Sequence, residues 1–103
     1  MTIKTGIDLV QNKRILKNLK NPEFLKKIFH PSELKNKNKL IGIFTLKEAF
    51  MKAIGKKLNW LDIEIITNEG RKPQIRTKNK FKSIDCSISH DGDYTIGVIV
   101  IEN

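Results

Sequence analysis

The sequence has little cysteine, few aromatic residues and no long hydrophobic segment. Its single cysteine, Cys86, excludes a disulfide within the chain and a zinc site built on several cysteines. No apolar run approaches the roughly 20 residues that span a bilayer. The first residues also lack the apolar stretch and small-residue cleavage site of a signal peptide. We therefore expect a cytoplasmic protein with no membrane-inserted segment.

The chain is too short for more than one domain, which we place at residues 1–103. Hydrophobic residues make up 39% of the sequence, which is enough for a small core. Because so short a chain buries a smaller fraction of its surface than a larger domain does, oligomerisation would not be surprising. The sequence contains no internal repeat, no low-complexity segment and no linker.

Acidic residues are scarce: Lys and Arg number 20 against 11 Asp and Glu, a formal net charge of +9. The excess is concentrated in residues 12–40, where nine basic residues stand against Glu23 and Glu33, a net charge of +7. Such a block indicates an acidic partner, which could be nucleic acid, an anionic membrane surface, an acidic protein or a phosphorylated ligand. An ordinary solvated helical surface is an equally good interpretation. Aromatic residues between the basic ones would favour nucleic acid, but Phe24 and Phe29 have the spacing of core residues instead.

The hydrophobic pattern predicts an α+β fold in which one strand is followed by helices and then by antiparallel strands. Residues 3–10 are β-branched and apolar and predict the first strand. Asn12 and Asn21 are expected to cap two short helices, the second with Pro22 at its first position. The later part of the chain has period-two patterns that predict four strands, the last two joined as a hairpin with glycine at its turn: residues 62–67, 73–76, 84–89 and 94–101.

The longest periodic segment is residues 40–54, which ends at Gly55 as helices often do. Its apolar face is wide and consists of Ile43, Leu46, Phe50 and Ile54 with Phe44, Met51 and Ala53 beside them. A helix that is apolar on most sides is expected to be buried. Thr45, Glu48 and Lys52 form a narrow polar stripe on this helix and therefore need partners or a function.

Four polar features stand out from the apolar pattern: Asp8 in the first strand, Glu48 with Lys52 on the long helix, Lys72-Pro73 after a turn, and Ser-Ile-Ser-His at residues 87–90. Each has an ordinary structural explanation. Asp8 could pair with a lysine or cap a helix, and Glu48 and Lys52 could form a surface ion pair. The later two features could belong to turns. As a set, however, two carboxylates from separate elements are a minimal Mg²⁺ site, and lysine and histidine suit phosphate oxygens.

Two stretches carry longer motifs. Residues 6–10 are Gly-Ile-Asp-Leu-Val, with Arg14 shortly after them, and residues 44–53 are Phe-Thr-Leu-Lys-Glu-Ala-Phe-Met-Lys-Ala. They resemble the Gly-Ile-Asp-Ile-Val…Arg-Ile and Phe-Ala-x-Lys-Glu-Ala-x-x-Lys-Ala motifs of the holo-acyl-carrier-protein synthase family of 4′-phosphopantetheinyl transferases. The resemblance covers residues 4–101. Three further stretches follow in the family's order: residues 24–33, Lys72-Pro73 and residues 87–90.

The sequence departs from the family at two loops. Gln11 stands where the family usually has glutamate, and Arg71 separates the glycine of the turn from Lys72-Pro73. The chain is also shorter than most of the family, chiefly between the helices. These differences concern loop contacts more than the metal site.

The resemblance implies the 4′-phosphopantetheinyl transferase fold, with an antiparallel sheet packed on a long buried helix and shorter N-terminal helices. It implies an enzyme for fatty acid and lipid synthesis that moves the 4′-phosphopantetheine arm of coenzyme A to a serine of apo-acyl carrier protein and releases adenosine 3′,5′-bisphosphate. By resemblance, Asp8 and Glu48 would hold Mg²⁺, and Glu48 and Lys52 would be catalytic. Glu48 or a water held by the metal could accept the serine proton. The residues implied to bind coenzyme A are Lys52, Lys72, Pro73, Ser89 and His90.

The resemblance also gives the basic block a partner, because acyl carrier proteins are strongly acidic. Arg14 matches a position on the family's carrier-docking helix. Three lysines on or near that helix would add electrostatic steering: Lys13, Lys17 and Lys20. Family members of this short type are trimers with active sites between subunits, so we expect a homotrimer and no nucleic acid. Two alternatives stay open, a small nucleic-acid-binding protein and a non-catalytic subunit that keeps the fold.

Overall fold

The computed structural model describes residues 2–103 and contains the predicted elements in the predicted order. The helical elements are α1 (Asn12–Asn18), α2 (Pro22–Ile28), α3 (Pro31–Leu34), the 3-10 turn η1 (Lys37–Lys39), the long helix α4 (Leu40–Ile54) and the 3-10 turn η2 (Trp60–Asp62). The strands are β1 (Ile3–Gln11), β2 (Ile63–Ile66), β3 (Gln74–Thr77), β4 (Ser83–Asp91) and β5 (Tyr94–Glu102). Every strand ends within two residues of its predicted limits, so the α+β class is confirmed.

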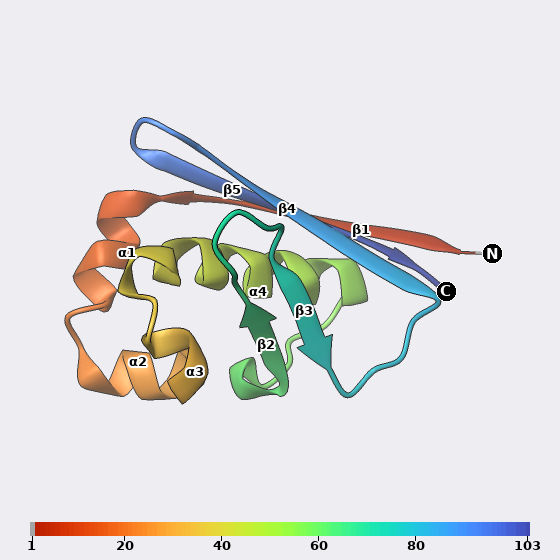
Figure 1. The fold of residues 1–103 in the computed structure, drawn as a ribbon, viewed down its shortest axis with the longest axis horizontal. Helices are drawn as coiled ribbons and strands as arrows, with labels where there is room; N and C mark the ends of the chain where they lie inside the picture. The colour runs from red at the N-terminus through yellow and green to blue at the C-terminus, as the bar shows by residue number, and fades with distance from the viewer. Residues whose placement is uncertain (1) are drawn as a thin grey trace.

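The strands form two antiparallel sheets. The larger sheet has the order β1-β5-β4, so the first strand of the chain pairs with the last, with Ile3 opposite Glu102 and Gln11 opposite Tyr94. Both chain ends therefore lie at the same end of the molecule (Figure 1). The predicted hairpin between β4 and β5 is confirmed, and Gly92 at its turn has a φ of 57°, which glycine adopts without strain. β2 and β3 form the smaller sheet.

The helix α4 packs on one face of the larger sheet, and β2, β3 and the short helices lie on its other sides (Figure 1). It begins over β4, crosses β5 and ends over β1. At β5, a Cβ atom added to Gly97 would lie 3.1 Å from Thr45 Cγ2. At β1 the approach is closer, because a Cβ atom on Gly6 would lie 1.9 Å from the carbonyl oxygen of Ala49. No side chain fits at Gly6, and this contact brings the next inward residue of β1, Asp8, against α4.

The hydrophobic core surrounds α4, as its sequence pattern predicts. Ile43, Leu46 and Phe50 are fully buried, while Ile54 is half-buried at the end of the helix. The predicted end of the helix is confirmed by Gly55, which has a φ of 87° and donates its N–H to the helix. None of the helices in residues 2–103 is long and apolar enough to cross a membrane.

The two predicted asparagine caps have different outcomes. Asn21 caps α2, since its Oδ1 accepts the N–H of Glu23 at 2.9 Å. The prediction for Asn12 is wrong, because Gln11 is the N-cap of α1 and Asn12 is the first residue of the helix. The side chain of Asn12 instead accepts a hydrogen bond from Thr95 of β5. The strand β1 continues one residue farther than expected, which shifts the cap by one position.

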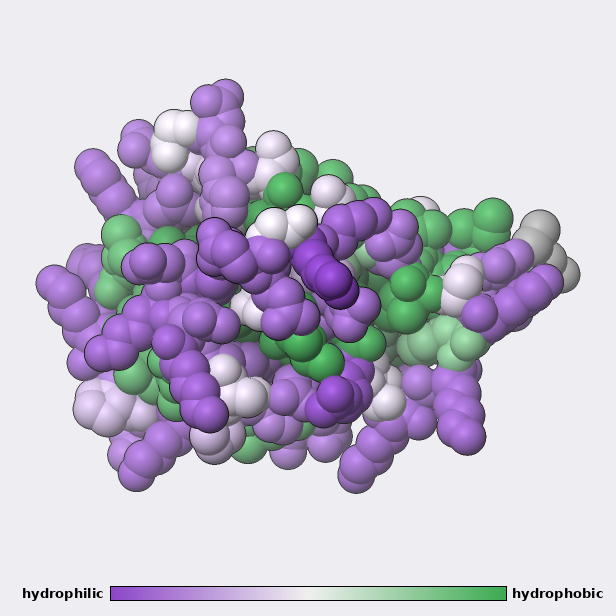
Figure 2. Space-filling view, viewed as in Figure 1, coloured by the Kyte–Doolittle hydropathy of each residue, from purple (hydrophilic) through white to green (hydrophobic). Residues whose placement is uncertain are grey.

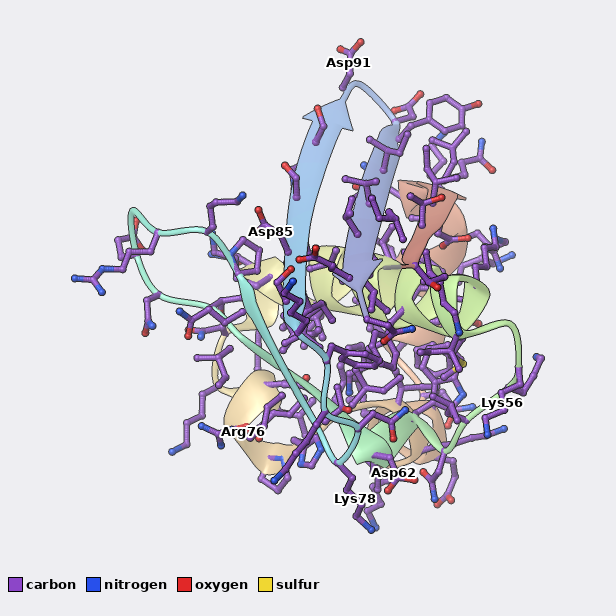
Figure 3. All side chains as sticks on the ribbon, turned by 90° about the vertical axis from the view of Figure 1, so that its right-hand side faces the viewer. Lys56, Asp62, Arg76, Lys78, Asp85 and Asp91 are labelled. Atoms are coloured by element: carbon purple, nitrogen blue, oxygen red, sulfur yellow. The ribbon has the colours of Figure 1, made fainter. Side chains whose placement is uncertain are left out.

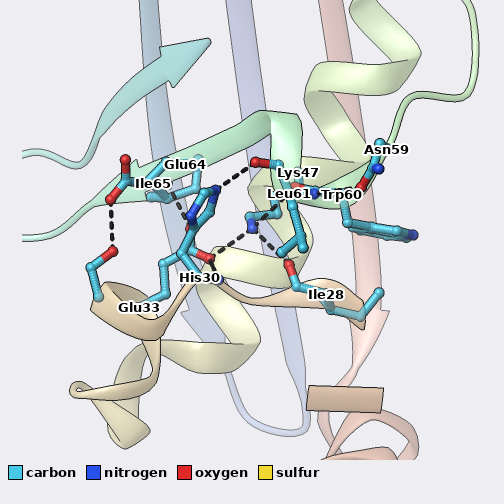
Figure 4. A network of polar contacts seen from close by, with 10 residues as sticks. Ile28, His30, Glu33, Lys47, Asn59, Trp60, Leu61, Glu64 and Ile65 are labelled. Atoms are coloured by element: carbon cyan, nitrogen blue, oxygen red, sulfur yellow. Dashed lines mark hydrogen bonds and ion pairs between the residues drawn. The ribbon is translucent and has the colours of Figure 1, made fainter. Parts of the chain in front are cut away.

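A buried ion pair that the sequence pattern does not predict joins α4 to α3 (Figure 4). Lys47 Nζ lies 2.7 Å from Glu33 Oε1, and both side chains are fully buried. The same ammonium donates to the carbonyl oxygens of Ile28 at 2.7 Å and Trp60 at 3.3 Å. The second oxygen of Glu33 accepts the N–H of Ile65 at 2.7 Å. This single cluster therefore joins α2, α3, α4, η2 and β2.

We expect Lys47→Met to lower the free energy of unfolding by about 3–5 kcal/mol, because it leaves Glu33 as a buried carboxylate without its cation. Burial lowers the pKa of Lys47, and the hydrogen bond and charge of Glu33 oppose that shift. Urea unfolding followed by circular dichroism measures the change. The matched control is Lys26→Met at an exposed lysine of α2, which should change stability by no more than about 0.5 kcal/mol. A loss below about 1 kcal/mol for Lys47→Met would contradict the assigned role.

Candidate functional site

Two carboxylates from different elements meet between β1 and α4. Asp8 points from β1 toward the helix and is 8% exposed, and Glu48 on α4 is half-buried. Burial raises the pKa of Glu48, and the negative charge of Asp8 raises it further. This repulsion is what two neighbouring carboxylates produce. The structure thus brings together the pair of residues that the sequence singled out.

Lys52 pairs with Asp8 and not with its neighbour on the helix. Its Nζ lies 3.0 Å from Asp8 Oδ1, and its side chain is 54% exposed. The ion pair with Glu48 that the helical spacing allowed does not occur among residues 2–103, although the charge of Lys52 lowers the pKa of Glu48. Lys52 therefore lies close to both carboxylates, and its side chain is accessible from solvent.

One oxygen of Asp8 is buried without a hydrogen-bond partner in the described part of the chain: Oδ2. An unpaired buried carboxylate oxygen is unfavourable, and a bound cation would satisfy it. Within residues 2–103 no three His, Cys, Asp or Glu side chains cluster as metal ligands. A cation here would thus have the two carboxylates of Asp8 and Glu48 and otherwise oxygens from water or a ligand. That donor set fits Mg²⁺, which often takes one or two carboxylates together with waters and phosphate oxygens.

A pocket of about 490 Å³ lies beside the beginning of α4. Three of the five residues implied to bind coenzyme A line it: Lys72, Pro73 and His90. Ser89 is not among its lining residues, and Ser87 takes that place. Lys52 lies instead at the carboxylates. The implied ligand-binding residues are therefore divided between the pocket and the carboxylate pair, and the role of Ser89 stays a prediction.

The pocket is more basic than the sequence analysis anticipated. Lys39 and Arg71 line it together with Lys72, and the first residues of α4 border it. Helix N-termini and basic side chains both favour anions. Lys72 Nζ lies 2.9 Å from Asp85 Oδ2, and this contact holds the pKa of Asp85 below its usual value. Both side chains are well exposed, and Asp85 lies beside β4 in Figure 3. A ligand can therefore compete with Asp85 for the lysine.

The sheet register places the pocket histidine and Asp8 on the same face of the larger sheet. Asp8 lies opposite Gly97 of β5, and His90 lies opposite Thr95. Gly97 and Thr95 are two residues apart and face α4, so the rows that contain Asp8 and His90 are about 7 Å apart along the sheet. His90 Nδ1 lies 2.8 Å from Thr95 Oγ1, which confirms that its ring is on this inner face. Asp8 on β1 and His90 on β4 therefore flank β5 from opposite sides.

The helix α1 starts directly after β1 and carries the predicted docking residues. Arg14 is exposed, and its charge reaches Glu48, whose pKa it lowers. Hydrophilic side chains cover the end of the molecule formed by α1, α2 and α3 (Figure 2). Three exposed lysines extend the positive charge on or just after α1: Lys13, Lys17 and Lys20. A partner that binds α1 would therefore lie next to the carboxylate pair.

Comparison with known proteins agrees with this geometry. Residues 4–99 match the family model of the 4′-phosphopantetheinyl transferase superfamily. The chain belongs to this superfamily. Similar proteins include the holo-[acyl-carrier-protein] synthase of Finegoldia magna, 36% identical over an alignment of 114 positions that covers 98% of this chain and 97% of the relative. That of Caldanaerobacter subterraneus subsp. tengcongensis is 38% identical over an alignment of 120 positions, which covers 97% of this chain and 94% of the relative.

A solved structure supports the same assignment. The crystal structure of Helicobacter pylori holo-[acyl-carrier-protein] synthase in complex with coenzyme A superimposes with a TM-score of 0.85. The two sequences are 33% identical, and the match covers 95% of this chain and 99% of the other. The predicted 4′-phosphopantetheinyl transferase fold, the family and the enzyme class are therefore confirmed.

The transferase signature at residues 44–53 combines structural and site residues. Lys47 lies in the buried ion pair, whereas Glu48 and Lys52 face Asp8. Neither the burial of Lys47 nor the contact of Thr95 with His90 was predicted from the sequence. Lys47 had one visible signal, since it is a charged residue within the most apolar helix of the chain.

We expect Glu48→Gln to stabilise the metal-free protein at pH 7, because it removes a charge that burial and Asp8 make unfavourable. The gain should be no more than about 1 kcal/mol, since solvent screens a half-buried charge. A raised carboxyl pKa means that the folded state binds the proton more tightly than the unfolded state. Stability is then lost as pH rises from the ordinary glutamate pKa of about 4.3 through the raised value. The advantage of Glu48→Gln should thus vanish below about pH 4.

Urea unfolding with a chelator present, at pH 7 and at acidic pH, measures this difference. Glu69→Gln in the exposed turn after β2 is the control and should have no effect at either pH. Destabilisation by Glu48→Gln at pH 7 would contradict the repulsion between Glu48 and Asp8.

Proposed function

We propose that this chain is a cytoplasmic, magnesium-dependent enzyme that transfers the 4′-phosphopantetheine arm of coenzyme A to a serine of apo-acyl carrier protein. The second product would be adenosine 3′,5′-bisphosphate, and the reaction would serve fatty acid and lipid synthesis. The observation that carries this proposal is the pair of Asp8 and Glu48, with Lys52 bonded to Asp8 and a basic pocket at the beginning of the same helix α4. The names of its relatives and the coenzyme A complex of the Helicobacter pylori protein support it.

The proposed reaction depends on neutralising charge. The serine oxygen attacks the phosphorus that carries pantetheine, while the bond from that phosphorus to the bridging oxygen of the pyrophosphate breaks. The anionic pyrophosphate repels the attacking oxygen, and the leaving phosphate gains charge. Mg²⁺ held by Asp8 and Glu48 would supply the Lewis acid that neutralises these oxygens.

Two residues of α4 would act in the transfer itself. Lys52 has a half-exposed side chain, so its ammonium can move from Asp8 to a phosphate oxygen. Glu48 has two carboxylate oxygens, so one can hold the cation while the other accepts a proton. We propose Glu48 as the group that takes the serine proton.

The pocket would hold the nucleotide end of coenzyme A. Its basic residues Lys39, Arg71 and Lys72 can pair with phosphate groups, and His90 can donate a hydrogen bond to the same kind of oxygen. Arg71, the residue that departs from the family's Gly-Lys-Pro turn, therefore adds a charge to the pocket. Pro73 restricts the backbone after Lys72 and so keeps that loop in place.

We expect Asp8→Asn to lower kcat for carrier modification by about 100-fold or more, because the cation would lose one of its two carboxylates. A transfer assay with purified apo-acyl carrier protein, coenzyme A and saturating Mg²⁺ measures the rate. The control is Asp62→Asn, an exposed aspartate of η2, which should keep full activity. Near-normal turnover of Asp8→Asn would remove Asp8 from the site. No transfer by the wild-type protein would instead favour a subunit that keeps the fold without the activity.

The basic surface of α1 would dock the carrier protein. Arg14 is exposed and close enough to Glu48 to affect its pKa, so a carrier bound there can present its serine to the site. The net charge of +7 over residues 12–40 exceeds what one coenzyme A molecule needs. Attraction of this kind weakens with salt, since the Debye length falls from about 10 Å at 0.1 M to about 3 Å at 1 M.

We expect Arg14→Glu to raise the KM for the carrier by at least about tenfold, because attraction becomes repulsion. The KM for coenzyme A should stay within about twofold, since the pocket and the carboxylates are unchanged. Steady-state kinetics with each substrate varied in turn separates the two. Lys78→Glu, after β3 (Figure 3), is the matched charge reversal and should leave both constants unchanged. A selective loss of coenzyme A affinity would place α1 in the nucleotide pocket instead.

The outer face of the larger sheet would form the contact between subunits. Alternate residues of β1 point away from α4, and the exposed apolar side chains on this face are Ile3, Ile7, Leu9, Tyr94 and Val100. A contiguous apolar patch marks an interaction surface. Because the family resemblance implies trimers, we propose that this face joins the subunits of a homotrimer. Sedimentation equilibrium should give three times the chain mass of 11.9 kDa, and a monomer at micromolar concentration would contradict the proposal.

A further inference from the structure

His90 is connected to the beginning of α1 by two hydrogen bonds through a buried threonine. His90 Nδ1 lies 2.8 Å from Thr95 Oγ1, and the Thr95 hydroxyl donates to Asn12 Oδ1 at 2.7 Å. The three residues come from the end of β4, the beginning of β5 and the first residue of α1. Thr95 is 1% exposed. The connection therefore crosses the end of the sheet on its inner side.

These two hydrogen bonds account for the presence of a hydroxyl group at position 95. The other inward residues of β5 are apolar or glycine: Gly97, Ile99 and Ile101. A valine would fill the same volume without a polar atom, and burying a hydroxyl is unfavourable unless it is hydrogen-bonded. Thr95 is thus placed for its contacts with His90 and Asn12.

The number of protons in this connection determines the tautomer of the histidine. A hydroxyl has a single proton, and Thr95 gives it to the amide oxygen of Asn12, which only accepts. Oγ1 can then only accept from His90, so Nδ1 must carry a proton. The other ring nitrogen, Nε2, has no hydrogen bond within residues 2–103. In the neutral ring it is the unprotonated nitrogen, and in the charged ring its N–H is available to a phosphate oxygen.

We propose that Thr95 and Asn12 are positioning residues: Thr95 accepts the Nδ1–H of His90 whether the ring is neutral or charged, which leaves Nε2 to take the second proton, and the charged ring donates that proton to a phosphate oxygen in the pocket. This inference rests on the proposed function, because it takes His90 as a contact of coenzyme A. It adds two residues to the site, and it links the pocket to the first residue of the carrier-docking helix. Neither Thr95 nor Asn12 is among the residues that line the pocket.

The chain contains an internal reference for the tautomer. Its only other histidine, His30, places Nε2 2.6 Å from the carbonyl oxygen of Leu61. A carbonyl only accepts, so His30 must carry its proton on Nε2. The two histidines of the protein are therefore expected to be opposite tautomers when both rings are neutral.

Long-range ¹H–¹⁵N NMR spectra of the full chain, recorded at a pH where both rings are neutral, test this without any substrate. The wild-type protein should show Nδ1–H for His90 and Nε2–H for His30. Thr95→Val removes the acceptor and should shift His90 toward Nε2–H, whereas Thr95→Ser keeps the hydroxyl and should behave as the wild type. His30 should be unchanged in all of them. A protonated Nε2 on neutral His90 in the wild type would overturn the proposal.

Variants of Asn12 test the same point without altering the buried threonine. Asn12→Leu removes the acceptor for the Thr95 hydroxyl, which can then donate to His90 Nδ1, so His90 should become the Nε2–H tautomer. Asn12→Asp keeps an accepting oxygen and should preserve Nδ1–H. An unchanged His90 tautomer in Asn12→Leu would overturn the proposal even if Thr95→Val fails to fold.

Kinetics separate a positioning role from a structural one. Thr95→Val should raise the KM for coenzyme A by about three- to tenfold while the KM for the carrier stays within twofold, and Thr95→Ser should restore it. In a His90→Ala background, Thr95→Val should cause no further loss. An equal loss in both backgrounds would overturn the proposal. Absence of any transfer by the wild-type protein would refute the proposed function, which the tautomer measurements do not require.

Discussion

The buried pair of Lys47 and Glu33 determines how the layers of this fold fit together. Two charges removed from water are tolerated only when their remaining donors and acceptors are also satisfied, and here backbone groups of three other elements complete the set. Glu48 follows Lys47 on the same helix, about 100° around its axis. When Lys47 is held toward α3, Glu48 is turned toward β1. The structural pair thereby sets the direction of the proposed metal ligand.

Much of this architecture could be predicted, because its signals are local. The apolar period of residues 40–54 and the turn at Gly92 each indicate a helix or a hairpin from a few neighbouring residues. The buried pair could not be predicted in this way. Its members are 14 positions apart on different helices, and periodicity does not tell which two charged residues are buried together.

The residues of the candidate site could be proposed from the sequence, but their contacts could not. Motif order singled out Asp8, Glu48 and Lys52, yet helical spacing pairs Lys52 with its neighbour on α4. The partner in the structure is Asp8, because the close contact at Gly6 brings β1 against α4. Thr95 left no signal, since a threonine in a strand is ordinary. Only the register across β4 and β5 shows which residue lies beside it.

The pairing of the first strand with the last has a consequence for biosynthesis. β1 precedes the other elements of residues 2–103 but has only β5 as a neighbour in its sheet, and β5 follows all of them. During translation, both edges of β1 therefore stay unpaired until β5 has been synthesised, and exposed strand edges favour association with other chains. Asp8 lies on β1, so the carboxylate pair can assemble only after synthesis of β5. A nascent chain stalled before residue 94 would be a candidate client for chaperones that bind exposed strands.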